Sequence, residues 1–184
     1  LDFIQDLSND LVYGVVRAGV NTGVNTALYG GDLGENLVAN LRFAAVTTLG
    51  AQAAEEIGKA YKNNDIDLAS RYIAHAALGA GMDVALGGDG ISGAAGAVVG
   101  ELAAEAFVAT YVDHVLSSTE FKSEDEFVEE AARLRQAGVD FAKLGAGLAA
   151  AVTGGDIGTA ALAGGNAAEN NAVVCLIIAC TVIG

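Results

Sequence analysis

Two neighbouring asparagines near the carboxyl end of the sequence are the residues best suited to chemistry on their own chain. They close the run Gly164-Gly165-Asn166-Ala167-Ala168-Glu169-Asn170-Asn171, and the apolar stretch 172–184 follows without a single charge. The side-chain amide of an asparagine lies close enough to its own carbonyl carbon to attack it, which makes the pair chemically labile. Asparagine pairs are also common at turns and helix ends, so the pair alone does not establish a function.

A histidine is the best general acid–base candidate outside this run. His75, Gly79 and Asp83 are spaced four residues apart, so on a helix they form one stripe with a glycine notch at its middle. In so apolar a sequence, a histidine is more commonly a buried residue with satisfied hydrogen bonds than a chemical group. Both interpretations of His75 stay open at this point.

Two carboxylates have the spacing of helix-bundle metal sites but lack the accompanying histidines. Glu101 and Glu105 are four residues apart. Bundle metal sites add Glu-x-x-His pairs, which neither of the two histidines completes. We therefore expect no metal centre, and we predict that these acids are solvated or paired with Arg71, Arg42 or Lys59.

A glycine-rich loop carries half of a dinucleotide-binding signature. Gly88-Asp89-Gly90-Ile91-Ser92-Gly93 matches Gly-x-Gly-x-x-Gly and precedes a predicted helix. The strand that should lead into such a loop is missing, because the preceding residues are few and rich in alanine. We expect neither a nucleotide nor any other cofactor here.

The composition narrows the class of protein and of partner. A formal charge of −14, with only 9 lysines and arginines, excludes nucleic acid as a direct partner. The chain is 53% apolar, which is too apolar for a disordered segment.

Both cysteines, Cys175 and Cys180, lie in the terminal apolar stretch, and we favour free thiols there. No run reaches the roughly 18 apolar residues of a membrane-spanning helix, and 172–184 comes closest.

The sequence predicts an all-α fold, a glycine- and alanine-rich bundle of about six helices with a C-terminal apolar tail. The 25 glycines, the many alanines and the absence of proline over 184 residues favour helices. Only residues 173–183 are rich enough in β-branched side chains to suggest a strand. Expected N-terminal caps are Asp32, Asp65 or Asp67, Ser92, Ser123 and Asp156. The expected helices cover about 1–29, 33–61, a third ending near 86, 92–116, 123–153 and 157–168.

Regularly spaced glycines predict places where helices approach closely. The tandem repeat Gly19-Val20-Asn21-Thr22 and Gly23-Val24-Asn25-Thr26 places glycine under glycine on one stripe of the first helix. We expect a neighbouring helix to pack over these glycines. The spacings Gly96-x-x-x-Gly100 and Gly154-x-x-x-Gly158 predict further close contacts.

Taken together, these segments resemble the pretoxin region of bacterial contact-dependent growth-inhibition proteins. The resemblance rests on 75–79, 93–101, 148–156 and the closing Ala168-Glu169-Asn170-Asn171, in that order. Those proteins are filamentous-haemagglutinin-like exoproteins of two-partner secretion, in which a Val-Glu-Asn-Asn motif precedes a variable toxin. Ala168 stands here in place of the valine. The resemblance implies a haemagglutinin-like helical module over 1–118, a pretoxin segment over 119–171 and the start of the variable region over 172–184.

The resemblance also implies where the protein acts and with what. The protein would be secreted to the bacterial cell surface by an outer-membrane transporter partner and would deliver a C-terminal toxin into a target cell. Further partners would be the toxin domain in cis and the target-cell membrane or translocation proteins.

Release of the toxin at the motif would proceed most simply by asparagine cyclisation. Asn171 would be the nucleophile, with Glu169, Asn170 or His75 as polarising groups, and the sequence does not rank these three. One alternative is a passive scaffold that is cut by a target-cell protease. Another is a membrane-inserting translocation helper, which the charge-poor residues from 144 onward favour and the acidic body opposes.

Overall fold

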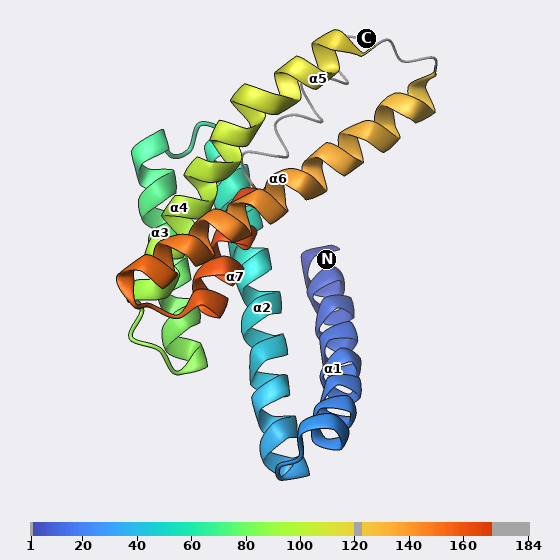
Figure 1. Ribbon diagram of the computed structural model, residues 1–184, viewed down its shortest axis with the longest axis vertical. Helices are drawn as coiled ribbons and strands as arrows, with labels where there is room; N and C mark the ends of the chain where they lie inside the picture. Colours follow the sequence, from blue (N-terminus) through green and yellow to red (C-terminus); the bar gives the residue numbers. More distant parts are fainter. Residues whose placement is uncertain (1, 120–122, 171–184) are drawn as a thin grey trace. The chain divides into compact units, whose positions relative to one another are not determined.

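The computed structural model describes residues 2–119 and 123–170, and every regular element in those ranges is helical. The elements are α1 (Asp2–Tyr29), α2 (Leu33–Lys62), α3 (Leu68–Leu86), α4 (Ile91–Phe107), the π-helix η1 (Val108–Val112), α5 (Asp113–Ser118), α6 (Glu124–Thr153) and α7 (Ile157–Asn170). Since α4, η1 and α5 follow one another without a break, six helical segments result, which confirms the predicted all-α fold (Figure 1). The suggested strand at 173–183 and the tail lie outside the described residues.

The chain divides into two compact units, Leu1–Ala53 and Ala54–Gly184. In the first unit, α1 and the first part of α2 form an antiparallel hairpin (Figure 1). Its seam uses small and polar side chains, with Ala18 and Thr22 buried on α1. Asn40 donates a hydrogen bond to the Thr22 hydroxyl at 3.1 Å, and Asn36 donates one to Thr26 at 2.9 Å.

The predicted close approach over the tandem-repeat glycines is wrong. A Cβ atom added at Gly19 or Gly23 would meet nothing within 4 Å, so these glycines face open space. The threonines of the repeat face α2 instead, and a Cβ at Gly14, two turns before Thr22, would lie 3.5 Å from that of Ala44. The repeat therefore does form one contact stripe, but the stripe consists of its threonines.

The second unit is built around α4, which packs against α3, α6 and α7. Glycines allow the closest approaches. A Cβ at Gly96 would lie 2.5 Å from the Cα of Ala160, and one at Gly100 would lie 2.3 Å from the Cα of Gly164. The predicted contact at Gly96-x-x-x-Gly100 is thus confirmed. The one at Gly154-x-x-x-Gly158 is wrong, because Gly154 caps the end of α6 with a left-handed backbone, φ 75°, and a Cβ atom added there would meet nothing within 4 Å.

Most of the predicted caps are present. Asp32, Asp67, Ser123 and Asp156 each accept a backbone hydrogen bond from the residue three positions later. Hydrogen bonds from the backbone N–H and from the side chain of Thr159 also hold the pKa of Asp156 below its ordinary value. Ser92 does not cap α4, since that helix begins after Gly90. The Ser92 hydroxyl instead accepts a hydrogen bond from the Asp156 N–H at 2.8 Å and so ties the start of α4 to the start of α7.

One helix among the described residues, Ile91–Val112, is long and apolar enough to cross a membrane. Its mean hydropathy is 1.4, and 39% of the window is buried inside the structure. A core helix of a water-soluble bundle gives the same pattern, so the observation is weak evidence for membrane insertion.

Candidate functional site

The register of α7 against α4 shows which residues of α4 lie level with the end of α7. The two helices run parallel, and four pairs of neighbours along them are each 64 residues apart in the sequence. These pairs are Ser92 with Asp156, Gly96 with Ala160, Gly100 with Gly164, and Ala104 with Ala168. By this register, Glu105 lies level with Glu169, and Asn170, the last residue of α7, comes one residue further along.

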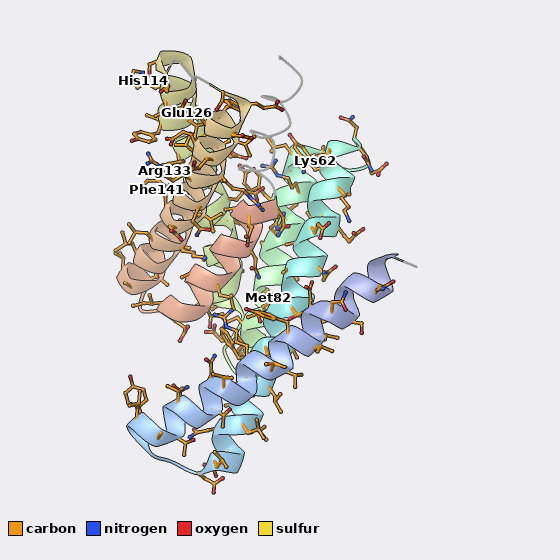
Figure 2. The ribbon with its side chains drawn as sticks, turned by 90° about the vertical axis from the view of Figure 1, so that its right-hand side faces the viewer. Lys62, Met82, His114, Glu126, Arg133 and Phe141 are labelled. Carbon is orange, nitrogen blue, oxygen red and sulfur yellow. The ribbon has the colours of Figure 1, made fainter. Side chains whose placement is uncertain are left out.

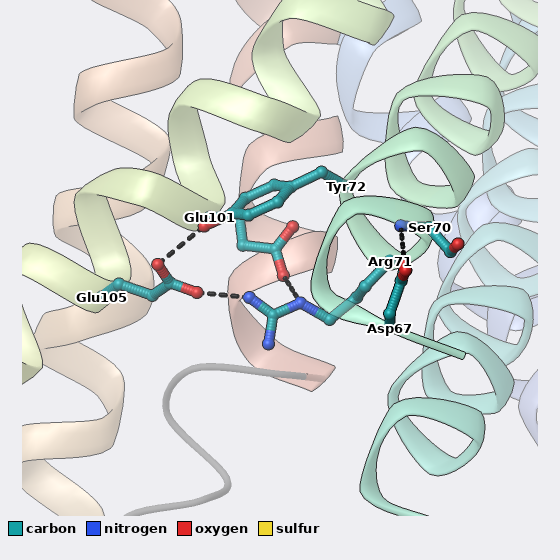
Figure 3. Close-up of polar contacts among 6 residues, drawn as sticks. All are labelled: Asp67, Ser70, Arg71, Tyr72, Glu101 and Glu105. Carbon is teal, nitrogen blue, oxygen red and sulfur yellow. Dashed lines mark hydrogen bonds and ion pairs between the residues drawn. The ribbon is translucent and has the colours of Figure 1, made fainter. Parts of the chain in front are cut away.

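A cluster of polar and charged side chains connects α3 with α4 (Figure 3). The Arg71 guanidinium pairs through Nε with Glu101 Oε1 at 2.6 Å and through Nη2 with Glu105 Oε1. Tyr72 donates its hydroxyl proton to Glu105 Oε2 at 2.7 Å. We call Arg71, Tyr72, Glu101 and Glu105 the charged cluster.

The members of the charged cluster differ sharply in their access to solvent. The side chains of Arg71 and Glu101 are only 5% and 0% exposed, whereas that of Glu105 is 39% exposed. One guanidinium faces two carboxylates, so the cluster carries one excess negative charge when all three groups are ionised. Of the two carboxylates, therefore, only that of Glu105 is accessible to solvent.

Local structure holds Arg71 in place. Asp67 accepts a 2.7 Å hydrogen bond from the Ser70 N–H and so fixes the first turn of α3, on which Arg71 lies. The guanidinium carbon also lies 4.3 Å from the centre of the Tyr61 ring, a cation–π contact. Arg71 is thus held by a ring on one side and by carboxylates on the other.

The pKa shifts in the cluster follow from burial and from these contacts. Burial, assisted by the hydrogen bond to Glu105, raises the pKa of Tyr72 to about 12, so the phenol keeps its proton at neutral pH. Burial alone would lower the pKa of Arg71. The carboxylates of Glu101 and Glu105 outweigh that effect and raise the pKa above its ordinary value.

The sequence predicted this pairing only in part. Arg71 is the partner of both acids, as one of the alternatives held. The expectation that the acids are solvated is wrong for Glu101, which is fully buried. Arg71 precedes His75 by four residues and so continues the stripe of His75, Gly79 and Asp83. Its position on that face of the helix could therefore have been predicted from the sequence. No group of three potential metal ligands occurs in the part of the chain that the structure describes.

His75 lies on the same face of α3 as Arg71, but about one turn further along the helix. It is 1% exposed. The antiparallel seam pairs Gly79 with Gly93 and Arg71 with Glu101, which places His75 level with Ala97. In the α4–α7 register this is the level of residue 161, nine residues or roughly 14 Å of helical rise from Asn170. The structure therefore does not bring His75 to the end of α7.

The motif residues lie where α7 ends. Ala168 is completely buried in a core cluster with Ala104, Val139 and Ala142. Glu169 is exposed, and Asn170 is half-buried and donates its side-chain amide to the Asn166 carbonyl at 2.9 Å. Asn171 lies outside the described residues.

The glycine-rich loop is filled by a side chain of the protein itself. Asp83, 2% exposed, accepts hydrogen bonds from the N–H groups of Gly90 at 3.0 Å and Gly93 at 3.3 Å. These are the donors that a phosphate would need at a helix N-terminus, and the loop already holds a carboxylate there. A second anion would meet charge repulsion at this position.

A comparison with known protein families finds a match for the first half of the chain. Residues 2–97 match the family described as "Possible hemagglutinin (DUF637)". The chain belongs to this family. The haemagglutinin-like match covers α1 to α3 and the first turns of α4, so it includes Arg71, Tyr72 and His75 and ends before Glu101. No curated protein and no solved structure matches the chain.

Proposed function

We propose that this region of a haemagglutinin-like exoprotein is a pretoxin domain that promotes cleavage after Asn171 and so releases a C-terminal toxin. The observation that supports the proposal best is the anchoring of the motif. Ala168 is 0% exposed in the core, and the helix ends two residues later. The folded body therefore holds the chain up to the residue before Asn171.

The chemistry that fits this arrangement is asparagine cyclisation. The Asn171 side-chain nitrogen bonds to its own backbone carbonyl carbon, and the bond from that carbon to the Ala172 nitrogen breaks. One proton passes from the attacking nitrogen to the departing amine, which leaves a succinimide at Asn171 and a free amino terminus at Ala172. A rigid body accelerates such a step by holding the chain near the attack geometry and by supplying proton transfer.

The setting of this reaction is part of the proposal. A haemagglutinin-like family suits a secreted or surface-exposed protein. The partners that we propose are an outer-membrane transporter during secretion, the toxin domain in cis, and the membrane or translocation proteins of a target cell into which the toxin is delivered.

Intact-mass measurement tests the proposal directly. We expect the purified chain, incubated with protease inhibitors, to lose the peptide 172–184 with a break after Asn171. The Asn171→Ala chain should stay whole under the same conditions, and Asn166→Ala serves as the control for an asparagine within α7. A wild-type chain that stays intact for days would show that the domain does not cleave itself. Cleavage only after addition of target-cell extract would favour a passive scaffold cut by a protease.

The hydropathy of Ile91–Val112 favours one other function, membrane insertion as a translocation helper. Glu101, which lies in that helix and is fully buried against Arg71, opposes it, because a charged group at the bilayer centre is costly. Release of a dye from liposomes on adding the protein would support insertion. Retention of the dye between pH 4 and pH 8 would count against it.

A further inference from the structure

We propose that the exposed apolar face of α1 binds the same face of a second copy of this chain, so that two α1–α2 hairpins join. We call this surface, with the glycines beside it, the α1 face. Its large side chains are Val12, Tyr13, Val16, Val20, Val24 and Leu28, drawn among the sticks on α1 in Figure 2. The inference does not depend on the proposed cleavage.

The first unit buries very little of its apolar surface. Ala18 is the one buried hydrophobic residue among the described residues of 1–53. The valines of the α1 face are 49–62% exposed, and Leu28 is 69% exposed. A small fold with so slight a core commonly gains stability by oligomerisation. The α1 face thus offers the apolar surface that the hairpin seam does not bury.

The four-residue repeat places this face on the side of α1 that points away from α2. Successive residues of a helix are turned by about 100°, so Val20 and Thr22 point about 160° apart. Thr22 is buried at the seam, where Asn40 of α2 donates a hydrogen bond to its hydroxyl at 3.1 Å. The hairpin therefore keeps its own contacts while the α1 face contacts a partner.

The α1 face has a ridge and a groove side by side. The ridge consists of Val16, Val20 and Val24, which are four residues apart. The groove consists of Gly19 and Gly23, and a Cβ atom added at either glycine would meet nothing within 4 Å. Ridges of this spacing pack into the grooves of a second helix that crosses at about −50°. Two copies of α1 are complementary in this way, which is what a twofold dimer requires.

Charge favours this face over other surfaces of the chain for contact between two copies. The chain carries a formal charge of −14, so two copies repel each other over most of their surface. Between residues 11 and 31 the single charged side chain is that of Arg17. Two copies therefore approach through the α1 face without carboxylate repulsion. A basic partner would find no carboxylate to pair with in this stretch.

The size of the α1 face fits a dimer that forms reversibly. Its six large residues expose on the order of 600 Å² in each copy, somewhat below the ~800 Å² that each partner buries in a standard interface. We therefore expect a dissociation constant in the micromolar range.

Sedimentation velocity of the full chain, from about 1 µM to about 200 µM, tests for the dimer. We expect the wild type to pass from monomer to dimer over this range. Gly23→Leu fills the groove, and Val20→Asp places a charge on the ridge, so each should raise the dissociation constant by about tenfold or more. Where the chain is monomeric, Gly23→Leu should unfold at no lower temperature than the wild type, because leucine favours the helix.

Gly81→Leu on α3 and Val128→Asp on α6 are the matched controls. A Cβ atom at Gly81 would likewise meet nothing within 4 Å, and Val128 is 55% exposed, close to the 61% of Val20. Both controls should leave the dissociation constant within about threefold of the wild-type value.

Three results would overturn the inference. The first is a wild-type chain that stays monomeric at about 200 µM. The second is a dimer that neither Gly23→Leu nor Val20→Asp weakens, since its interface would then lie elsewhere. The third is a monomeric chain that binds vesicles of neutral phosphatidylcholine and loses this binding in Val20→Asp, because the α1 face would then contact a membrane.

Discussion

Arg71 is the residue on which the polar interior of the second unit depends. Its side chain is almost completely buried, and its guanidinium neutralises the buried Glu101 and part of the charge of Glu105. Buried ion pairs are costly to form from solvated charges, and they are much costlier to break from one side. The reason is that a single charge is then left in a medium that solvates it poorly.

Arg71→Met should therefore destabilise the protein by about 3–5 kcal/mol, because the Glu101 carboxylate loses its guanidinium. The double variant Arg71→Met/Glu101→Met should recover much of this loss, since it removes the buried Glu101 carboxylate together with its partner. Denaturant unfolding followed by circular dichroism measures both. Additive losses in the double variant would show that the two charges are not coupled.

At the scale of single residues, the sequence identified the acids but not their burial. Glu101 and Glu105 are separated from Arg71 by a turn and by about 30 residues. The helical period places Glu101 and Glu105 on one face of their own helix. It does not predict which neighbouring helix that face contacts, or through which residues. His75 illustrates the same limit: its burial was expected from its apolar surroundings, whereas its level in the bundle follows only from the register of α3 against α4.

At the scale of helices, α4 depends on glycines where it meets α7. A Cβ atom at Gly100 would lie 2.3 Å from the Cα of Gly164, a distance at which one backbone has to move. At Gly23, on α1, nothing lies within 4 Å. The two glycines are chemically identical and both helical, so they form a matched pair for substitution.

Gly100→Ala should destabilise the protein by about 1–3 kcal/mol through overpacking against α7. Gly23→Ala should stabilise it by about 0.5–1 kcal/mol, because alanine restricts the unfolded chain and favours the helix. Thermal unfolding of the two variants beside wild type tests both signs. Equal effects would show that the α4–α7 contact does not require a glycine.

Helix boundaries were well predicted because glycine pairs and capping acids mark them locally. The sequence did not predict which stripe of a helix packs against its neighbour, as the tandem repeat shows. A four-residue repeat creates parallel stripes of glycine, valine, asparagine and threonine, and only the partner decides among them. Here the asparagines of α2 select the threonine stripe through hydrogen bonds from Asn36 and Asn40. Ser92 was misassigned for a related reason, since its partner is Asp156, 64 residues away.

At the scale of the whole molecule, the two compact units bury very different surfaces. The hairpin seam of residues 1–53 buries Ala18 and Thr22, while a stripe of large apolar side chains, spaced four residues apart on α1, stays exposed. That stripe consists of Val12, Val16, Val20, Val24 and Leu28. The second unit buries larger groups, among them Met82, Val112, Leu134 and Val139. The boundary between the units, after Ala53, does not coincide with the domain boundary predicted near residue 118, which stays a prediction.

The fragment 54–184 should therefore fold and cleave without the first unit, because its helices bury a core of their own and it holds the charged cluster and the motif. We expect a cooperative thermal transition by circular dichroism and a cleavage rate within about threefold of the full chain. The fragment 1–53 should be only marginally helical alone, because a two-helix seam of small side chains buries too little apolar surface to offset the conformational entropy lost on folding. A fragment 54–184 that is unfolded would show that its fold depends on residues 1–53. A fragment that is folded but no longer cleaves, while the full chain does, would show that residues 1–53 take part in the reaction.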